Sequence, residues 1–440
     1  MIARDVQART FAERVLARGT ELERTGPAWL AELRRASRAR FDALGLDAAQ
    51  ADGWSAGDLA SLAATPLAQA PHGQAPALPL PAAACILPDA YRLVLVDGRP
   101  VEPFTPSTRS DDEPWITSLS AALREAPALL EAVLSRRVPA ELPALTALGA
   151  ALAEDGAVVV VPPGATLGRP IHIVHLTTER REPAAIHSRS VVVAQRSSQA
   201  RVVETHLALG VGPYWTNALT EVEVGENAAL EHYRIQIEGP QAIHVSSIAS
   251  RLAAASRYVS RRLDLGGRIV RHDLGCVLDG NGAEAVLDAL WIAREDQHLT
   301  HTTLLDHARE HTASRELYKG VLAGRARGTF HGRILVRAGA QKTDAKQSNP
   351  NLLLSEAALA HTRPQLEIRA DDVKCTHGAT IGRLDEDAVF YLRSRGVGLA
   401  AARRMLVRAF AAEVLERMDL APVRQFAEER VDEALDGIGA

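Results

Sequence analysis

The sequence predicts a mainly β protein with α-helical segments at both ends and a parallel β-helix (β-solenoid) in the middle. From Ala157 onward, short runs rich in Val and Ile alternate with Gly, Pro, Ser and Asn, which is typical of strands and turns. The clearest runs are Val158–Val161, Ile171–Val174, Val191–Val193 and Val222–Val224. Before and after this region, apolar residues recur at helical spacing.

A regular spacing favours a solenoid over other β folds. Five apolar residues lie 28 positions apart: Val174, Val202, Leu230, Tyr258 and Val286. A repeat of 20–50 residues is typical of coils that bury their apolar face against their neighbours. A two-layer β-sandwich with similar strand spacing is the alternative.

The order of patterns predicts five regions. Residues 1–63 form an N-terminal helical domain, in which Leu30, Leu33, Phe41 and Leu44 follow helical spacing. Residues 64–88 are a Pro/Ala-rich linker, and 89–156 hold a strand and helices that lead into the core. The β-helix core spans 157–382, and 383–440 form a C-terminal helical domain.

Composition narrows the class of function. The net charge of −4 gives no electrostatic indication of a nucleic-acid or anionic-membrane partner. The first 18 residues lack the apolar stretch of a signal peptide, and no run of 18 apolar residues occurs. Cys85, Cys276 and Cys375 are an odd, widely spaced set that suits a reducing cytosol, so we expect a cytoplasmic protein.

Several common catalytic motifs are absent. The sequence has no GxxxxGK[ST] phosphate loop, no strand–GxGxxG–helix and no HExxH. We therefore expect no enzyme activity in this chain, and any ATP hydrolysis that drives it would come from another chain.

Two segments could bind a metal. His307 and His311, in the histidine-rich stretch 297–311, are four residues apart, but a strand or turn there favours surface or turn histidines over a metal site. Cys375 and His377 are two apart, so on a strand a thiol and an imidazole would point the same way. Such a pair suits iron or zinc, but two ligands do not complete a tetrahedral site, so carboxylates or a second subunit must add the others. A buried cysteine beside a hydrogen-bonded histidine is the alternative.

Six consecutive segments resemble signature segments of one family. They are Glu316–Gly320, Phe330–Ile334, Ala340–Gln347, Asn351–Ser355, Ala370–Gly382 (ADDVKCTHGATIG) and Phe390–Gly396 (FYLRSRG). Their order and compact spacing resemble the SufB/SufD family of iron–sulfur cluster assembly scaffolds, and within it the SufD branch. The resemblance extends back to Ala157.

The resemblance implies a right-handed parallel β-helix between helical domains. It implies pairing with a SufB paralogue along the edges of the β-helix and docking of a SufC ATPase of the ABC type on the C-terminal helices. Residues of that partner surface would be Phe390, Tyr391, Arg395, Gly396 and Arg403.

The resemblance also implies where the cluster forms. His377 would lie at the SufB interface as a metal ligand, with Cys375 as a second candidate. No cofactor is expected to bind tightly to the isolated chain. Iron and a transient iron–sulfur cluster would be present in the complex, and reduced flavin is a further candidate there.

Three alternatives remain beside the SufD interpretation. A SufB-like scaffold would carry Glu-His-Glu-Ala where this chain has Lys374–Gly378, and more cysteines. The other two are an iron-binding homodimer and, least favoured, a carbohydrate-active β-helix lyase. The sequence departs from the family pattern at Gly53–Asp58, where a Trp-Lys-Tyr-Thr-like segment is expected.

Overall fold

The computed structural model describes residues 2–46, 56–66, 84, 86–101, 110, 112–134, 143–179 and 181–436. Cys85, Gly53–Ser55 and most of the predicted linker 64–88 lie outside these ranges.

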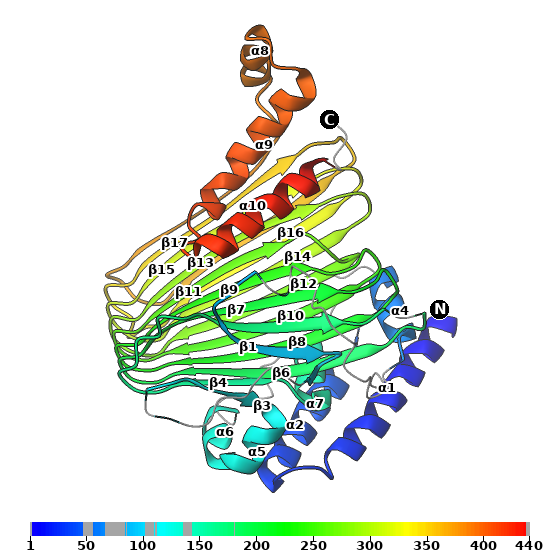
Figure 1. Cartoon of the computed structure of the whole chain (residues 1–440), viewed down its shortest axis with the longest axis vertical. Coiled ribbons are helices and arrows are strands. Elements are labelled where there is room, and N and C mark those ends of the chain that lie inside the picture. The colour runs from blue at the N-terminus through cyan, green and yellow to red at the C-terminus, as the bar shows by residue number, and fades with distance from the viewer. Residues whose placement is uncertain are drawn as a thin grey trace.

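Two large sheets wind around a common core (Figure 1). The ten-stranded sheet has the order β19 (Lys374–Gly382), β17 (Asp344–Leu353), β15 (Ala313–Leu322), β13 (Glu284–Ala293), β11 (Arg257–Asp264), β9 (Ala229–Ile237), β7 (Gln199–Ala208), β5 (Ile171–Thr177), β1 (Tyr91–Val96) and β2 (Arg99–Pro100). The nine-stranded sheet has the order β18 (Leu359–Ile368), β16 (Arg327–Val336), β14 (His298–His307), β12 (Ile269–Leu278), β10 (Ile243–Leu252), β8 (Trp215–Val224), β6 (Ala185–Ala194), β4 (Ala157–Val161) and β3 (Trp115–Ser118).

From β4 to β19, successive strands alternate between the sheets, and each strand pairs in parallel with the strand two places earlier or later in the chain. This topology is a parallel β-helix, so the predicted fold class is confirmed. The two-layer sandwich alternative is wrong. Antiparallel pairing occurs only where the core begins, between β1 and β2 and between β3 and β4, within the residues described.

The 28-residue spacing holds for only one step of the five-residue series. Leu230 pairs with Tyr258, 28 positions later, but Val202 pairs with His232, 30 positions later, and Ile171 pairs with Val202, 31 positions later. The coils differ because the connections between strands differ in length. Residues 209–214 join β7 to β8, whereas the shorter stretch 265–268 joins β11 to β12.

Turns at one edge of the solenoid stack on each other through residues with positive φ. Ser197, Asn227 and His311 have φ of 57°, 56° and 58°, and each donates its backbone N–H to a carbonyl of the next coil. Asn tolerates this left-handed conformation well, which explains the Asn in the turn at 225–228. At these positions, hydrogen bonds between turns therefore link one coil to the next.

Helices cover the outer face of each sheet. On the nine-stranded side lie α1 (Ile2–Leu22), α2 (Ala28–Leu44), α4 (Ala56–Ala64), α5 (Leu119–Glu125), α6 (Pro127–Leu134) and α7 (Ala144–Leu152). Phe11 packs there between Phe41 of α2 and Trp215 of β8. On the ten-stranded side, α9 (Leu399–Leu415) and α10 (Ala421–Asp436) pack on the sheet, and α8 (Glu386–Ser394) projects beyond the strands (Figure 1). None of the described helices is long and apolar enough to cross a membrane.

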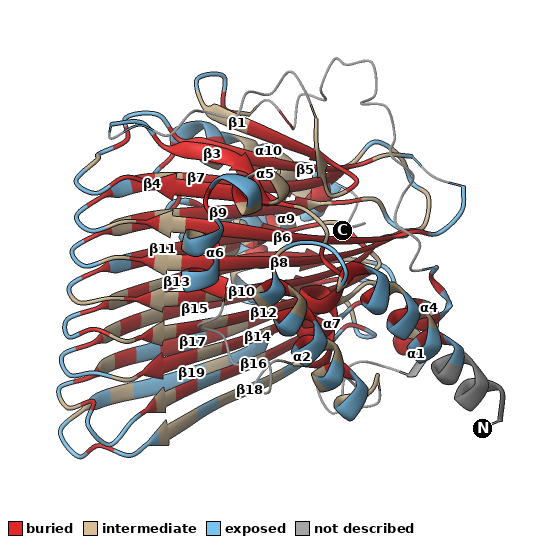
Figure 2. Cartoon of the chain, turned by 90° about the horizontal axis from the view of Figure 1, so that it is seen from below, coloured by how far each residue is buried: buried red, intermediate tan, exposed pale blue. Residues whose placement is uncertain are grey.

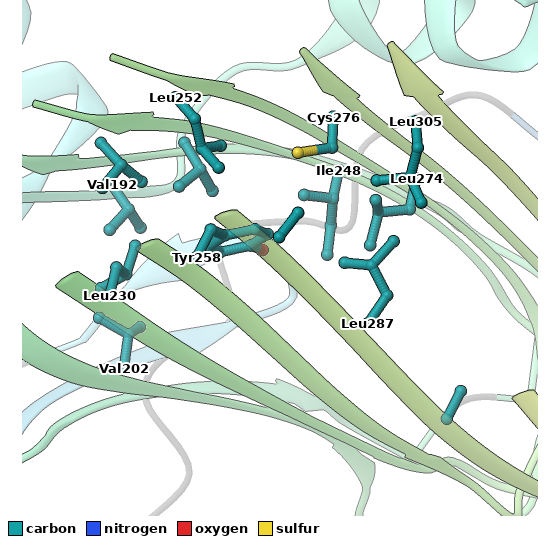
Figure 3. Close-up of a cluster of buried hydrophobic side chains, with 14 of the residues drawn as sticks. Val192, Val202, Leu230, Ile248, Leu252, Tyr258, Leu274, Cys276, Leu287 and Leu305 are labelled. Carbon is teal, nitrogen blue, oxygen red and sulfur yellow. The ribbon is translucent and has the colours of Figure 1, made fainter. Parts of the chain in front are cut away.

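The space between the sheets holds the main apolar core (Figure 3). Val202, Leu230 and Tyr258 from the ten-stranded sheet face Val192 and Ile248 from the nine-stranded sheet. Every second residue of a strand points inward, so each coil contributes a thin layer of mostly aliphatic side chains.

A column of buried imidazole rings also runs through this interior. Neighbouring ring centroids lie 4.2 Å apart between His175 and His206, 4.9 Å between His206 and His244, 5.1 Å between His244 and His272, and 5.2 Å between His272 and His301. In several strands, the row of inward-facing side chains is therefore apolar towards one end of the strand and polar towards the other.

Candidate functional site

The solenoid ends in two strands that each have one free edge. Within the described part of the chain, β18 pairs only with β16, and β19 pairs only with β17. Each strand therefore leaves a row of backbone N–H and C=O groups without a strand partner, and such an edge can pair with another chain. Both strands are long, with ten and nine residues.

Burial falls sharply towards this end of the molecule (Figure 2). The strands in the middle of the solenoid are almost fully buried, whereas β18 and β19 are exposed or half-buried along their length. Three large apolar side chains are exposed there: Leu359 (46%), Ile368 (42%) and Ile381 (48%). A long free strand edge that also carries exposed large apolar side chains is unusual on a protein that stays monomeric.

Cys375 and His377 lie on β19 with one residue between them. Cys375 is opposite Ala345 of β17 and is half-buried against the core, while His377 is opposite Gln347 and is exposed. Partial burial raises the pKa of the Cys375 thiol, and the nearby Asp344 carboxylate adds to this effect. No hydrogen bond or ion pair from another described residue reaches the His377 ring.

This pair offers one thiol and one imidazole at an open strand edge. A tetrahedral iron or zinc site needs four ligands, so at least two must come from outside the pair. Metal binding by His377 and Cys375 stays a prediction.

The segment after β19 presents aromatic side chains to solvent. Asp385 caps the N-terminus of α8 by accepting hydrogen bonds from the backbone of Asp387 and Ala388. Phe390 and Tyr391 on this short helix are 72% and 57% exposed.

Two further predicted residues follow these aromatics. The Arg395 guanidinium lies 5.0 Å from the centre of the Tyr391 ring. Gly396 has φ +88°, a conformation that suits glycine and reverses the chain between α8 and α9.

Arg403 occupies a different environment from the exposed aromatic residues. It is half-buried and lines a cleft of about 330 Å³ between α9, the end of α10 and the end of β17. Glu386 and Asp436 also line this cleft, but neither Phe390 nor Tyr391 does. Partner binding by the five predicted residues stays a prediction.

Ion pairs hold the C-terminal helices on the ten-stranded sheet. Lys319 Nζ of β15 lies 2.7 Å from Glu413 Oε2 of α9, and its ammonium is 4.0 Å from the centre of the Phe410 ring. Arg417 Nη1 lies 2.9 Å from Oδ1 of the buried Asp288. These contacts fix the C-terminal half of α9, while α8 lies beyond the strands.

The histidine-rich segment 297–311 is only partly on the surface, contrary to the sequence interpretation. His311 lies in a turn, but His301 and His307 point into the solenoid and are buried. His307 is satisfied by hydroxyl groups, with Nδ1 2.8 Å from Thr312 Oγ1 and Nε2 2.9 Å from Ser314 Oγ. His307 and His311 therefore do not share a metal.

The sequence interpretation also missed the other buried polar groups of the interior. His175 follows the inward-facing Ile173 by two positions, and His301 follows Leu299 by two. In a strand, this spacing puts the imidazole on the same face as the core residue. That alternation is the signal that identifies them once the inward face is known.

Comparison with known proteins agrees with this architecture. Residues 175–410 match the SufBD core domain of the SUF iron–sulfur cluster assembly system, and residues 10–173 match the SufBD N-terminal region. The core match runs from β5 to α9, which includes the free strand edges. The chain belongs to the SufBD family.

Individual SufBD relatives are similar over most of the chain. A SufBD family protein of iron–sulfur cluster assembly from Synechocystis sp. is 35% identical over 77% of this chain and 77% of its own length. The iron–sulfur cluster assembly protein SufD of Escherichia coli is 31% identical over 79% of this chain and 80% of its own length. The chloroplastic protein ABCI7 of Arabidopsis thaliana is 34% identical over 63% of this chain and 60% of its own length. The resemblance to the SufB/SufD family is therefore confirmed.

Proposed function

We propose that this SufBD protein is a non-catalytic scaffold subunit for de novo iron–sulfur cluster assembly. It pairs with a SufB-like paralogue through β18 and β19 and recruits a SufC-like ATPase through its C-terminal helices. The observation that carries this proposal is the free edge of β19, which bears the exposed His377. The similarity to a protein named SufD supports the same assignment.

Pairing at the free edge would give the last coil the strand partner that it lacks in the isolated chain. A partner strand would satisfy the backbone groups of β18 and β19 and would cover Leu359, Ile368 and Ile381. A SufB-like paralogue would present an edge of the same kind, since it would share the solenoid fold.

The cluster is cargo that the two chains build between them. His377 supplies one nitrogen ligand from this chain, and the partner supplies the thiolates that the pair on β19 cannot provide. Cys375 is the weaker candidate of the two, because its thiol is half-buried and its raised pKa disfavours the thiolate form that binds metal.

The ATPase docks on α8, the part of the C-terminal region that does not pack on the sheet. Phe390 and Tyr391 are exposed aromatic residues on a helix that projects beyond the strands, a composition typical of interface centres. Hydrolysis on the ATPase can then act on the scaffold through α9, which is anchored to β15 by Lys319.

The test is cluster assembly by a reconstituted complex of this chain with a SufB-like and a SufC-like protein. His377→Ala should lower the cluster yield several-fold while the complex still forms and the chain stays folded. His311→Ala, which removes an exposed histidine from a turn outside β18 and β19, is the matched control and should keep the wild-type yield. Wild-type yield from His377→Ala would remove this residue from the site.

The same experiment separates the alternatives. An iron-binding homodimer predicts self-association through β18 and β19 with no gain in yield from the paralogue. A SufB-like role predicts that a cysteine thiolate of this chain takes the outer sulfur of a donor persulfide, which releases the donor's thiolate. Other proposals need assays of their own. A polysaccharide-cleavage assay tests the lyase alternative. Absorbance titration of the complex tests reduced flavin as an electron source, and cell fractionation tests the cytoplasmic location.

A further inference from the structure

Three buried side chains with metal-binding atoms converge in the first coils of the solenoid. His175 of β5 is opposite His206 of β7, and Glu204 of β7 lies two residues before His206 on the same inward face. The Nε2 atoms of His175 and His206 lie 3.9 Å and 3.6 Å from Glu204 Oε2, and one ligand atom from each residue lies within 4.8 Å of the others. The two imidazole rings are stacked with their centroids 4.2 Å apart.

This trio is buried and its hydrogen bonding is incomplete. The side chains of Glu204, His206 and His175 are 0%, 2% and 11% exposed. His175 Nε2 and His206 Nδ1 have no hydrogen-bond partner among the described residues. His232 Nε2 also lacks one, although it faces Glu204 Oε1 at 3.3 Å. Buried polar atoms are nearly always paired, so His175 Nε2, which faces Glu204, points to an absent partner that accepts an electron pair.

We propose that His175, Glu204 and His206 form a binding site for a divalent first-row transition metal ion, with ferrous iron and zinc as the fitting ions. Two imidazoles and one carboxylate form a ligand set found for both ions in proteins, with further positions left for water or another side chain. His232, on the other side of Glu204, is placed to be that side chain. Magnesium and calcium prefer all-oxygen sites and do not suit this set. The proposal does not depend on the cluster site at His377, which lies on the last strand of the same sheet.

Arg234 is the group that a metal ion must displace. Its Nη2 donates a hydrogen bond of 2.9 Å to His206 Nε2, and its Nε lies 3.4 Å from Glu204 Oε2. The guanidinium thus neutralises Glu204 in the metal-free protein and occupies the lone pair of His206. Asp264 also interacts electrostatically with Arg234 and provides an alternative partner when the metal binds. Arg234 is therefore a competitor of the metal, and removing it should tighten binding.

His175 is the member of the trio nearest the surface. It lies near the end of β5, which ends at Thr177, and it is the only one of the three whose side chain is more than 2% exposed. Its Nε2 atom is buried, so an ion reaches the trio only when this end of the core opens. Of the three ligand substitutions, one at His175 should disturb the core least.

The test is metal titration of the full-length chain carrying Cys375→Ser and His377→Ala, so that the predicted cluster ligands are absent. After chelator treatment, the protein is titrated without oxygen with Fe²⁺, Zn²⁺ and Co²⁺. We expect one equivalent of each ion to bind, and the Co²⁺ absorption spectrum to lack the sulfur-to-metal band of a thiolate site. Glu204→Gln and His175→Gln should each weaken binding by at least about tenfold.

Two further variants complete the design. His187→Gln removes a buried imidazole that packs on Trp215, outside the trio, and should bind as the parent does. Arg234→Met should bind more tightly than the parent, and added Zn²⁺ should raise its melting temperature more. No bound metal in the parent, or equal binding by His175→Gln and the parent, overturns the proposal. These outcomes do not affect the function proposed for His377, which the cluster-assembly experiment tests separately.

Discussion

Lys319 and Glu413 join the solenoid to its last helices, with Nζ 2.7 Å from Oε2. The ammonium is buried, at 6% exposure, while the carboxylate is half exposed. The ammonium therefore depends on this one carboxylate and on the face of the Phe410 ring for compensation.

Lys319→Met should loosen α9 from β15. Because a hydrogen bond to a charged group is lost but no charge is left buried, we expect the free energy of unfolding to fall by about 1–2 kcal/mol. Hydrogen exchange should quicken in α9 and not in β15. Arg325→Met, which breaks an exposed pair with Asp296, is the control and should leave the melting temperature unchanged. Equal effects of the two variants would contradict this role of Lys319.

Gly320→Ala should destabilise the core through a steric clash. A Cβ atom at this position would meet Asn351 Oδ1 at 2.5 Å and Cε2 of the buried Trp291 at 2.6 Å. Overpacking of this kind costs about 1–3 kcal/mol, which urea unfolding can measure. Gly378→Ala on β19 is the matched control, because no atom lies within 4 Å of its Cβ position, and its unfolding curve should match the wild type.

Glu316 should make the stability of the protein depend on pH. Burial raises the pKa of this carboxyl from 4.5 to about 7, although Gln347 Nε2 donates a hydrogen bond of 2.6 Å to it. Below pH 4.5 the group is protonated in both the folded and the unfolded chain, so its contribution to stability is complete. As the pH rises to 7, the unfolded chain ionises first, and about 3 kcal/mol of stability is lost.

Glu316→Gln should remove this loss, because the amide cannot ionise and still accepts from Gln347. The variant should gain stability relative to the wild type between pH 5 and pH 8 in urea unfolding. The exposed Glu356→Gln should show no such gain. Asp264, whose pKa burial also raises to about 7, is present in all three proteins and cancels in the comparison. A parallel pH profile for Glu316→Gln and the wild type would refute the prediction.

Phe390 and Tyr391 should matter for the ATPase and not for the fold. The double variant Phe390→Ser/Tyr391→Ser removes two exposed rings, so the melting temperature should stay the same, while recovery of a SufC-like ATPase in pull-downs should fall about tenfold or more. Leu209→Ser, an exposed apolar residue on the connection between β7 and β8, should retain the ATPase. Full recovery by the double variant would place the docking surface elsewhere, with the cleft at Arg403 as the next candidate.

The fold could be predicted because its signals are local. The Val-rich strands, the Asp97–Gly98 turn with φ of 52° and 81°, and the helical periodicity near both ends each depend on neighbouring residues. The coil length could not be predicted from a single spacing, since it depends on how many residues each connection needs. Leu230 and Tyr258 are partners, but Val174 and Val202 are not.

The candidate site could be predicted only in part, because burial depends on which face of a strand points inward. The exposure of His377 follows from β19 being the last strand, which the sequence pattern after Gly382 indicates. The burial of His301 depends instead on which face of β14 points inward, and polar residues such as Thr300 and Thr302 flank it on both sides. A prediction that places histidines on the surface by default therefore misses polar side chains that point into the solenoid.

Buried polar groups between the sheets make several coils of this solenoid differ from one another. Glu204 of β7 pairs with Arg234 of β9, and Asp264 of β11 pairs with His272 of β12, 2.8 Å away. If one of these coils were deleted, duplicated or shifted by one step, a buried carboxyl group would lose its partner, at a cost far above that of an aliphatic mismatch. The array should therefore melt in one cooperative transition and should not fray from its ends, and evolution can lengthen its loops more easily than it can change the number of its turns.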